Sequence, residues 1–544
     1  GAEPEGSTTV ATRGSLVKHG GRWWVCAFEV DKYWFAAPLG DAKPSAAGAG
    51  GAGGAGSGAP EADGVWAQMA VDCLQRPTPV QAERAQLADG LSTGVMAVDV
   101  LAPIGLGQSM LVCGPRGAGK STLAREVLER VLAERRPEKA LRFCTDPDSP
   151  LVDLAPHGGV APELADLPPA GLAAEGSPAL LAPLFASVGA AEAVRDAGGH
   201  ALLVLDTIDP LLRAWSLARQ WAEAELGRAL DAELAAAQRR NFFAGLLERA
   251  ANLSRGGSLT LVALAETEAM AALATVAGGA AARGGCAAAE YALADFEGRR
   301  DSELERLRRL VDRGVALTDA SLAAVGIAPP AAGGQDPARE GLAMRELQSL
   351  SDGQIILDGV AAAAGDFPAV VPGATFSRFG LGSAGGAGQQ PQGPPPAGRE
   401  RRDVRPPVLQ AVAAHLRTNL ALEREAHFRP SSGSEDGAQS AHMQAVRAAL
   451  LQPPRSPLPP EEMATLLLVA CSGALAELPA DKAAAVLRGG GGAPLLRHLR
   501  EAAPQVLRRV AEEGRLSEAA VRELEVAVRL FVVLQQAPAA AEGR

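Results

Sequence analysis

The amino-acid sequence predicts an α/β fold in which helices cover a parallel sheet. Apolar, strand-like runs at residues 109–113, 201–205 and 259–264 are separated by longer stretches with helical patterns. A glycine-rich segment follows the first run directly and leads into an expected helix over residues 121–134. Alternation of short apolar strands with helices is typical of a parallel sheet, because each crossover between parallel strands needs a long connection.

The glycine-rich segment, GPRGAGKS, fits the phosphate-binding pattern G-x-x-x-x-G-K-[ST]. Its glycines let backbone N–H groups turn toward phosphate oxygens, and the following helix directs its positive end at the anion. The pattern predicts that ATP or ADP binds here with Mg²⁺, Lys120 neutralising the phosphates and the Ser121 hydroxyl binding the metal. The predicted binding residues are Gly114, Pro115, Arg116, Gly117, Ala118, Gly119, Lys120, Ser121 and Thr122.

A phosphate-binding loop needs a carboxylate at the end of a neighbouring strand to hold the water shell of Mg²⁺. The apolar run at 201–205 ends in Asp206, which we expect to take this role through water. Asp209 is a second candidate, but it lies further into the loop, where it could simply cap the next helix.

Composition excludes several classes of protein. The 544 residues suggest two to four domains at roughly 100–200 residues each. A net charge of −11 argues against a nucleic-acid binder. The six cysteines are scattered without a CxxC pair, which favours a reducing compartment. No apolar run approaches the ~18 residues of a membrane span, so we expect membrane association only through partners.

Changes in composition divide the chain into five expected segments. These are a β-rich region at 1–43, a Gly/Ala linker at 44–64, a nucleotide-binding domain at 65–382 with an insertion at 269–348, a Pro/Gly-rich linker at 383–407, and a helical domain at 408–544.

Short motifs around the loop resemble a known family. Thr93-Gly94, the AVD at 97–99 and the PIGLGQ at 103–108 are similar to the segment that precedes the loop in rotary ATPase alpha and beta subunits. Further segments resemble alpha rather than beta, at residues 194–196, 246–250, 257–260, 351–355, 377–380, 456–459 and 514–518. The chain therefore resembles the alpha subunit of F-type ATP synthases, over residues 90–268 and 349–535.

The resemblance implies a RecA-like P-loop NTPase core with a reduced, β-barrel-like N-terminal region and a C-terminal helical bundle. It implies that the chain alternates with a beta subunit in a hetero-hexamer, together with rotor and stalk subunits. Such a chain binds nucleotide without hydrolysing it, in a complex that couples ATP synthesis to hydrogen ion transport. The expected location is the matrix side of an energy-transducing inner membrane, mitochondrial before plastid, with the bacterial cytoplasmic face left open.

The resemblance also assigns individual residues. Arg378 matches an arginine finger that reaches the nucleotide of the adjacent beta subunit, and Gln452 matches one of two glutamines that contact the base. Asp146 takes the place of a glutamate that is catalytic in beta subunits and a glutamine in alpha subunits. Its shorter side chain and its place before a proline argue for a turn residue.

Two alternatives remain open at this point. The insertion at 269–348 and a helical pattern at 222–240, where the family has a Pro/Gly-rich segment, suit an alpha-derived structural or regulatory protein outside the motor. A self-assembling P-loop ATPase of the same superfamily is the other alternative.

Overall fold

The computed structural model describes residues 12–19, 22–30, 33–40, 62–87, 89–134, 137, 139–144, 149–151, 180–266, 290–291, 317–318, 345–378, 403–428 and 434–536. The chain separates into two compact units, one of Gly1–Glu266 with Leu347–Arg544 and one of Thr267–Glu346. In the second unit, β11 (Glu290–Tyr291) pairs antiparallel with β12 (Leu317–Thr318). The other helices and strands of the described residues that are named below belong to the first unit.

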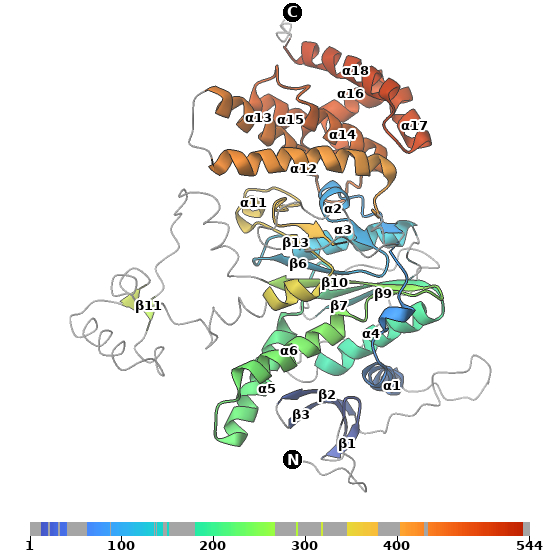
Figure 1. Ribbon diagram of the computed structural model, residues 1–544, viewed down its shortest axis with the longest axis vertical. Coiled ribbons are helices and arrows are strands. Elements are labelled where there is room, and N and C mark those ends of the chain that lie inside the picture. Colours follow the sequence, from blue (N-terminus) through green and yellow to red (C-terminus); the bar gives the residue numbers. More distant parts are fainter. Residues whose placement is uncertain are drawn as a thin grey trace, which may run out of the picture. The chain divides into compact units, whose positions relative to one another are not determined.

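A seven-stranded sheet forms the centre of the first unit, with strand order β14-β13-β6-β10-β8-β7 and β9 paired to β10. Figure 1 labels β13, β6, β10, β7 and β9 of this sheet. Five strands are parallel, as expected for an α/β fold: β6 (Ser109–Gly114), β7 (Lys139–Cys144), β8 (His200–Asp206), β10 (Ser258–Glu266) and β13 (Gly353–Ile356). The edge strand β14 (Phe376–Ser377) and the short β9 (Ala251–Asn252) run antiparallel to their neighbours. The runs predicted at 109–113, 201–205 and 259–264 are thereby confirmed as strands.

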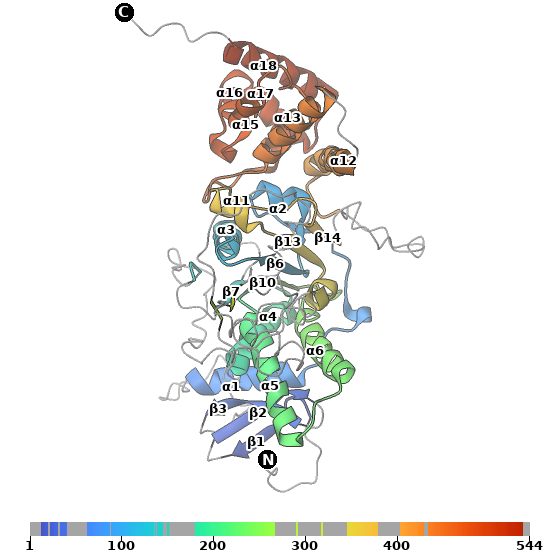
Figure 2. The ribbon, with the colours of Figure 1, turned by 90° about the vertical axis from the view of Figure 1, so that its left-hand side faces the viewer.

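Helices cover both faces of this sheet. In Figure 2, α3 lies on one side of the strands and α4 and α6 lie on the other. The helices of this region are α1 (Ala62–Gln75), α2 (Met96–Leu101), α3 (Lys120–Glu134), α4 (Leu181–Asp196), α5 (Asp209–Leu226), α6 (Ala232–Leu247) and α11 (Gly359–Ala363), with a short 3-10 helix at Gln81–Glu83. The two-residue strands β4 (Gly90–Leu91) and β5 (Ile104–Gly105) pair beside the start of β6.

The N-terminal residues form a three-stranded antiparallel sheet of β1 (Leu16–His19), β2 (Arg22–Val30) and β3 (Tyr33–Gly40). The β-rich character expected for this region is present, but the structure does not confirm a barrel. The sheet packs on α5 and α6 through aromatic rings, with the Phe28 centroid 4.8 Å from Trp215 and 4.9 Å from Phe242. Aromatic rings at these separations stabilise a contact by more than the area they bury. Much of this chain's small aromatic content lies in this one contact.

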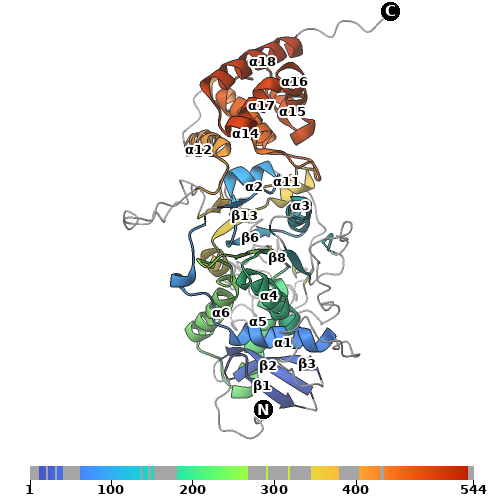
Figure 3. The same cartoon turned by 90° about the vertical axis from the view of Figure 1, so that its right-hand side faces the viewer.

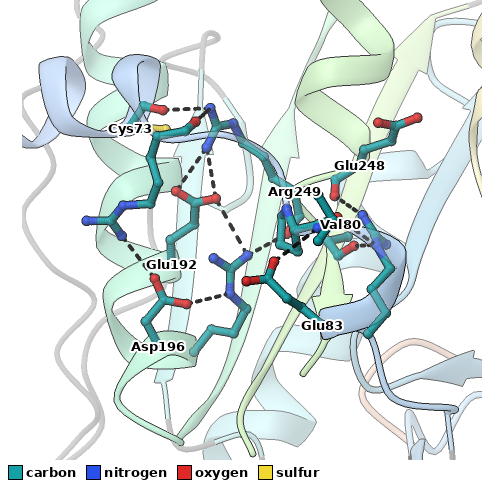
Figure 4. A network of polar contacts seen from close by, with 12 residues as sticks. Cys73, Val80, Glu83, Glu192, Asp196, Glu248 and Arg249 are labelled. Carbon is teal, nitrogen blue, oxygen red and sulfur yellow. Dashed lines mark hydrogen bonds and ion pairs between the residues drawn. The ribbon is translucent and has the colours of Figure 1, made fainter. Parts of the chain in front are cut away.

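A buried polar network ties the end of α1 to α4 and to the residues between α6 and β9 (Figure 4). The guanidinium of Arg249 is fully buried and pairs with both carboxylate oxygens of Glu192 on α4, at 2.9 and 3.0 Å. It also donates to the backbone carbonyl oxygens of Cys73 and Arg76 at the end of α1, at 2.6 and 3.1 Å. Arg195 on α4 donates to the carbonyl oxygen of Arg249 at 2.8 Å. Two motifs that carried the family resemblance, at 194–196 and 246–250, meet in this network.

The C-terminal part is helical, as predicted, and its helices pack around one apolar core that includes Met96 and Val100 of α2 (Figure 3). Its helices are α12 (Pro407–Phe428), α13 (Ser434–Ala449), α14 (Pro460–Ser472), α15 (Ala480–Leu487), α16 (Pro494–Ala502), α17 (Pro504–Glu513) and α18 (Glu518–Gln536), with a 3-10 turn at Gly490–Gly492. None of the described helices is both long and apolar enough to cross a membrane.

Candidate nucleotide site

The predicted phosphate-binding loop joins β6 to α3 at the carboxyl edge of the parallel strands. Gly117 and Gly119 have φ of +77° and +87°, the left-handed region that residues with a β-carbon rarely adopt. A β-carbon added at Gly117 would meet no atom within 4 Å, so its conformation, and not lack of space, requires glycine there. Arg116 is exposed at the tip of the loop, and Thr122 is half-buried in the first turn of α3.

Lys120 is the cation of the loop and is only 7% exposed. Its Nζ donates to the carbonyl oxygens of Gly114 and Pro115, both at 2.9 Å. Burial lowers the pKa of Lys120, and the carboxylates of Glu266, Asp209 and Asp206 oppose that shift. The loop therefore holds a desolvated ammonium group where a phosphate would lie.

Ser121 and Asp206 lie together across the carboxyl edge of the sheet. The Ser121 Oγ donates to Asp206 Oδ1 at 3.1 Å, and Asp206 is 1% exposed. A hydroxyl and a carboxylate are the oxygen ligands that Mg²⁺ takes in nucleotide sites, so the donor set fits this ion. The loop, the ammonium and the paired oxygen donors likewise fit a nucleoside phosphate.

Ser149 also contacts Asp206, and nothing in the sequence pattern pointed to it. Its Oγ donates to Asp206 Oδ2, and its side chain is buried, at 5% exposed. Its place shortly after the end of β7, the strand that pairs with β8, was the one available signal.

Asp209, the alternative metal carboxylate, has a different set of contacts. Both of its oxygens accept the backbone N–H of Glu266, at 3.1 and 2.9 Å. Burial raises the pKa of Asp209. The carboxyl group fastens the first turn of α5 to the end of β10.

Two further residues that the resemblance assigned to the nucleotide site are Asp146 and Gln452. Asp146 lies outside the described residues. Gln452 is 4% exposed, its side-chain oxygen accepts the N–H of Met96 at 3.1 Å, and its amide nitrogen donates to the carbonyl oxygens of Gly94 (2.8 Å) and Ser456. These contacts join the residues before α14 to the start of α2, and the contact of Gln452 with the base stays a prediction.

Arg378 lies at the opposite edge of the sheet from the loop. It directly follows β14, whose Ser377 pairs with Gly353, and Gly353 pairs in turn with Met110 near the start of β6. The four residue steps from Met110 to Gly114 span about 13 Å of strand. The exposed guanidinium donates from Nη2 to the carbonyl oxygen of Ser349 at 2.8 Å, before β13 begins. Arg378 is therefore placed away from the loop of its own chain.

No protein-family model matches the chain. The chain is similar to ATP synthase subunit alpha 2 of Gluconobacter oxydans, with 31% identity over 215 residues, 36% of this chain and 38% of the relative. It is similar to ATP synthase subunit alpha 3 of Paraburkholderia xenovorans, with 27% identity over 425 residues, 75% of this chain and 61% of the relative. ATP synthase subunit alpha 2 of Cereibacter sphaeroides is 32% identical over 217 residues, 36% of this chain and 39% of the relative. The matches thus cover less than two thirds of the length of each of these relatives.

Proposed function

Because the chain is a diverged, alpha-subunit-like relative of these ATP synthase subunits, we propose that it binds Mg-ATP or Mg-ADP at residues 114–121 without hydrolysing it. The observation that carries the proposal is the meeting of Lys120, Ser121 and Asp206 at one edge of the parallel sheet. A lysine ammonium, a hydroxyl and a carboxylate are the three groups that a P-loop site needs for a Mg-nucleotide.

Each residue of the site has a defined task in this proposal. Lys120 neutralises the outer phosphates: two of its three N–H groups donate to the loop carbonyls, and the third can donate to the ligand. The Ser121 hydroxyl and the Asp206 carboxylate would hold Mg²⁺, Asp206 through water. When bound, the ion neutralises phosphate charge and fixes the geometry of the phosphate chain.

The contacts of Asp206 and Asp209 favour binding over catalysis. A group that activates water must lie within hydrogen-bond reach of that water. Asp206 is engaged by two serine hydroxyls and Asp209 by the N–H of Glu266. The remaining candidate from the sequence is Asp146, which would need to act with a side chain one methylene shorter than glutamate. We expect negligible turnover by the isolated chain.

The placement of Arg378 supports a role toward a second subunit. At the edge opposite its own loop, the guanidinium lies away from its own nucleotide site, which suits a role toward a nucleotide bound by a neighbour. The neighbour in this proposal is a beta subunit in an alternating hetero-hexamer, attached to rotor and stalk subunits in a proton-translocating complex. The relatives are bacterial, so the cytoplasmic face of a bacterial membrane suits the proposal better than the mitochondrial matrix.

Calorimetry with Mg-ATP tests the proposed binding. Lys120→Ala removes the main phosphate cation, so we expect its titration to show no binding while the unchanged chain binds. Lys482→Ala on α15 removes an exposed lysine from the C-terminal helices and serves as the matched control. Equal affinity of the Lys120→Ala variant and the unchanged chain would refute a working P-loop and favour an alpha-derived structural protein.

A further inference from the structure

Both carboxylate oxygens of Asp206 accept a serine hydroxyl, and the two serines come from different elements. Ser121 Oγ, in the first turn of α3, donates to Oδ1, and Ser149 Oγ, beyond the end of β7, donates to Oδ2. A carboxylate that accepts at one oxygen alone can still rotate about the bond to its Cβ. Donors at both oxygens fix the plane of the group.

The backbone that carries Ser149 is fastened from two sides. Arg125 of α3 donates from Nη1 to the carbonyl oxygen of Pro150 at 3.1 Å, and Arg142 of β7 donates to the carbonyl oxygen of Leu151. The Ser149 Oγ also accepts the N–H of Leu151 at 3.2 Å, and the Leu151 side chain is fully buried. The hydroxyl of Ser149 is thus held in place by its own backbone, by a helix and by a strand of the core.

Ser121 has a second task in a P-loop site, which is to bind Mg²⁺. A hydroxyl can bind Mg²⁺ through its oxygen while its hydrogen still points at a carboxylate. Ser149 lies on the other side of Asp206 and donates to the oxygen that Ser121 does not contact. Its hydroxyl is therefore available for orienting the carboxylate whether or not a metal is bound.

We propose that Ser149 is a positioning residue of the Mg²⁺ site, which fixes the Asp206 carboxylate so that Oδ1 faces Ser121 and the metal. The inference rests on the proposed binding of Mg-nucleotide. It adds a residue that contributes to the affinity for Mg-ATP but not to the affinity for ATP without metal. Asp206 is 1% exposed, so water does not readily replace a lost hydroxyl donor there.

The test compares nucleotide affinity with Mg²⁺ and with the metal chelated, by calorimetry with ATP. Ser149→Ala is expected to lose about tenfold in affinity for Mg-ATP, the worth of one hydrogen bond to a charged group. Its affinity for ATP without metal is expected to stay unchanged. Ser187→Ala is the matched control, because Ser187 is also buried and donates to Pro183 O within α4, away from the loop.

Each outcome decides the inference. Ser149 does not position the carboxylate if the unchanged chain and Ser149→Ala bind Mg-ATP with equal affinity. The same follows if Ser149→Ala loses affinity for ATP equally with and without metal. In both cases the proposed binding stands. If the unchanged chain binds no nucleotide, the proposed function fails and the inference fails with it. Should Ser149→Ala not fold, Ser149→Cys replaces it with the same expectation, because a thiol is a weak donor.

Discussion

At the scale of single residues, the site is organised around one buried cation. Lys120 is enclosed by its own loop, and three acidic side chains at the ends of β8, β10 and the start of α5 act on it electrostatically. A buried ammonium is stabilised by partners of opposite charge, and a phosphate would supply more charge at closer range. Nucleotide binding should therefore favour the protonated lysine strongly.

This preference predicts a pH dependence of nucleotide affinity. Burial lowers the pKa of Lys120 in the empty protein below the ordinary lysine value of 10.5. A bound phosphate raises that pKa again, so affinity is complete below the empty-state pKa and falls as pH rises through it. We expect the fall to begin below pH 10.5 in titrations with Mg-ATP. Lys120→Arg keeps its charge over the same range, so its affinity should not change there; a parallel decline in this variant would assign the effect to another group.

At the scale of elements, the motifs that resemble the family turn out to hold helices together. Arg249 and Glu192 form a fully buried pair that joins α4 to the residues before β9 and to the end of α1. Thr93 and Gly94 are held locally by Asp99 of α2, whose carboxylate accepts both of their N–H groups and the Thr93 hydroxyl and so fixes the start of that helix. These residues support the site indirectly, through the positions of the elements around it.

Breaking the Arg249–Glu192 pair should destabilise the fold substantially. Arg249→Met leaves the carboxylate of Glu192 buried beside Arg195, whose Nη1 is 3.5 Å away, and we expect a loss of about 3–5 kcal/mol in free energy of unfolding. The measurement is chemical denaturation. Replacing Glu192 by Gln in the same chain should recover part of the loss, because no unpaired charge then remains. Arg255→Met is the control. It removes a guanidinium that pairs with Asp196 and is 62% exposed, so it should cost less than about 1 kcal/mol. Equal losses for Arg249→Met and Arg255→Met would contradict this view of the network.

The sequence was sufficient for the elements whose pattern is local. The core strands and the helix after the loop follow from continuous apolar runs and from a motif with fixed spacing. Closure of the N-terminal strands into a barrel depends on pairing between distant residues, which a β-rich composition does not specify. Ser149 was missed because a single serine has no pattern, and its contact with Asp206 depends on how α3 and β7 hold residues 149–151. Gln452 was assigned by resemblance alone, and its contacts with Gly94, Met96 and Ser456 appear only in three dimensions.

At the scale of the whole molecule, the two edges of the parallel sheet in the first unit carry different functional groups. The carboxyl edge of the parallel strands carries the loop with Lys120, Ser121 and Asp206, and the amino edge carries Arg378 beside the starts of β6 and β13. A chain with the proposed nucleotide site at one edge and an exposed arginine at the other suits a ring in which each subunit completes the site of its neighbour. The arginine finger is thus a property of the assembly that we propose and not of the isolated chain.

The most direct measurement is the steady-state ATPase rate of the chain reconstituted with a beta subunit. An arginine finger contributes ~10³–10⁵ in rate in related phosphoryl-transfer enzymes, so Arg378→Ala should nearly abolish turnover by the complex. Assembly and the affinity of the isolated chain for Mg-ATP should be unchanged, because Arg378 lies away from its own loop. Arg378→Lys keeps the charge without the planar fork and should recover only part of the rate. A complex of Arg378→Ala with the beta subunit that forms normally and hydrolyses ATP at the rate of the unchanged complex would contradict the account.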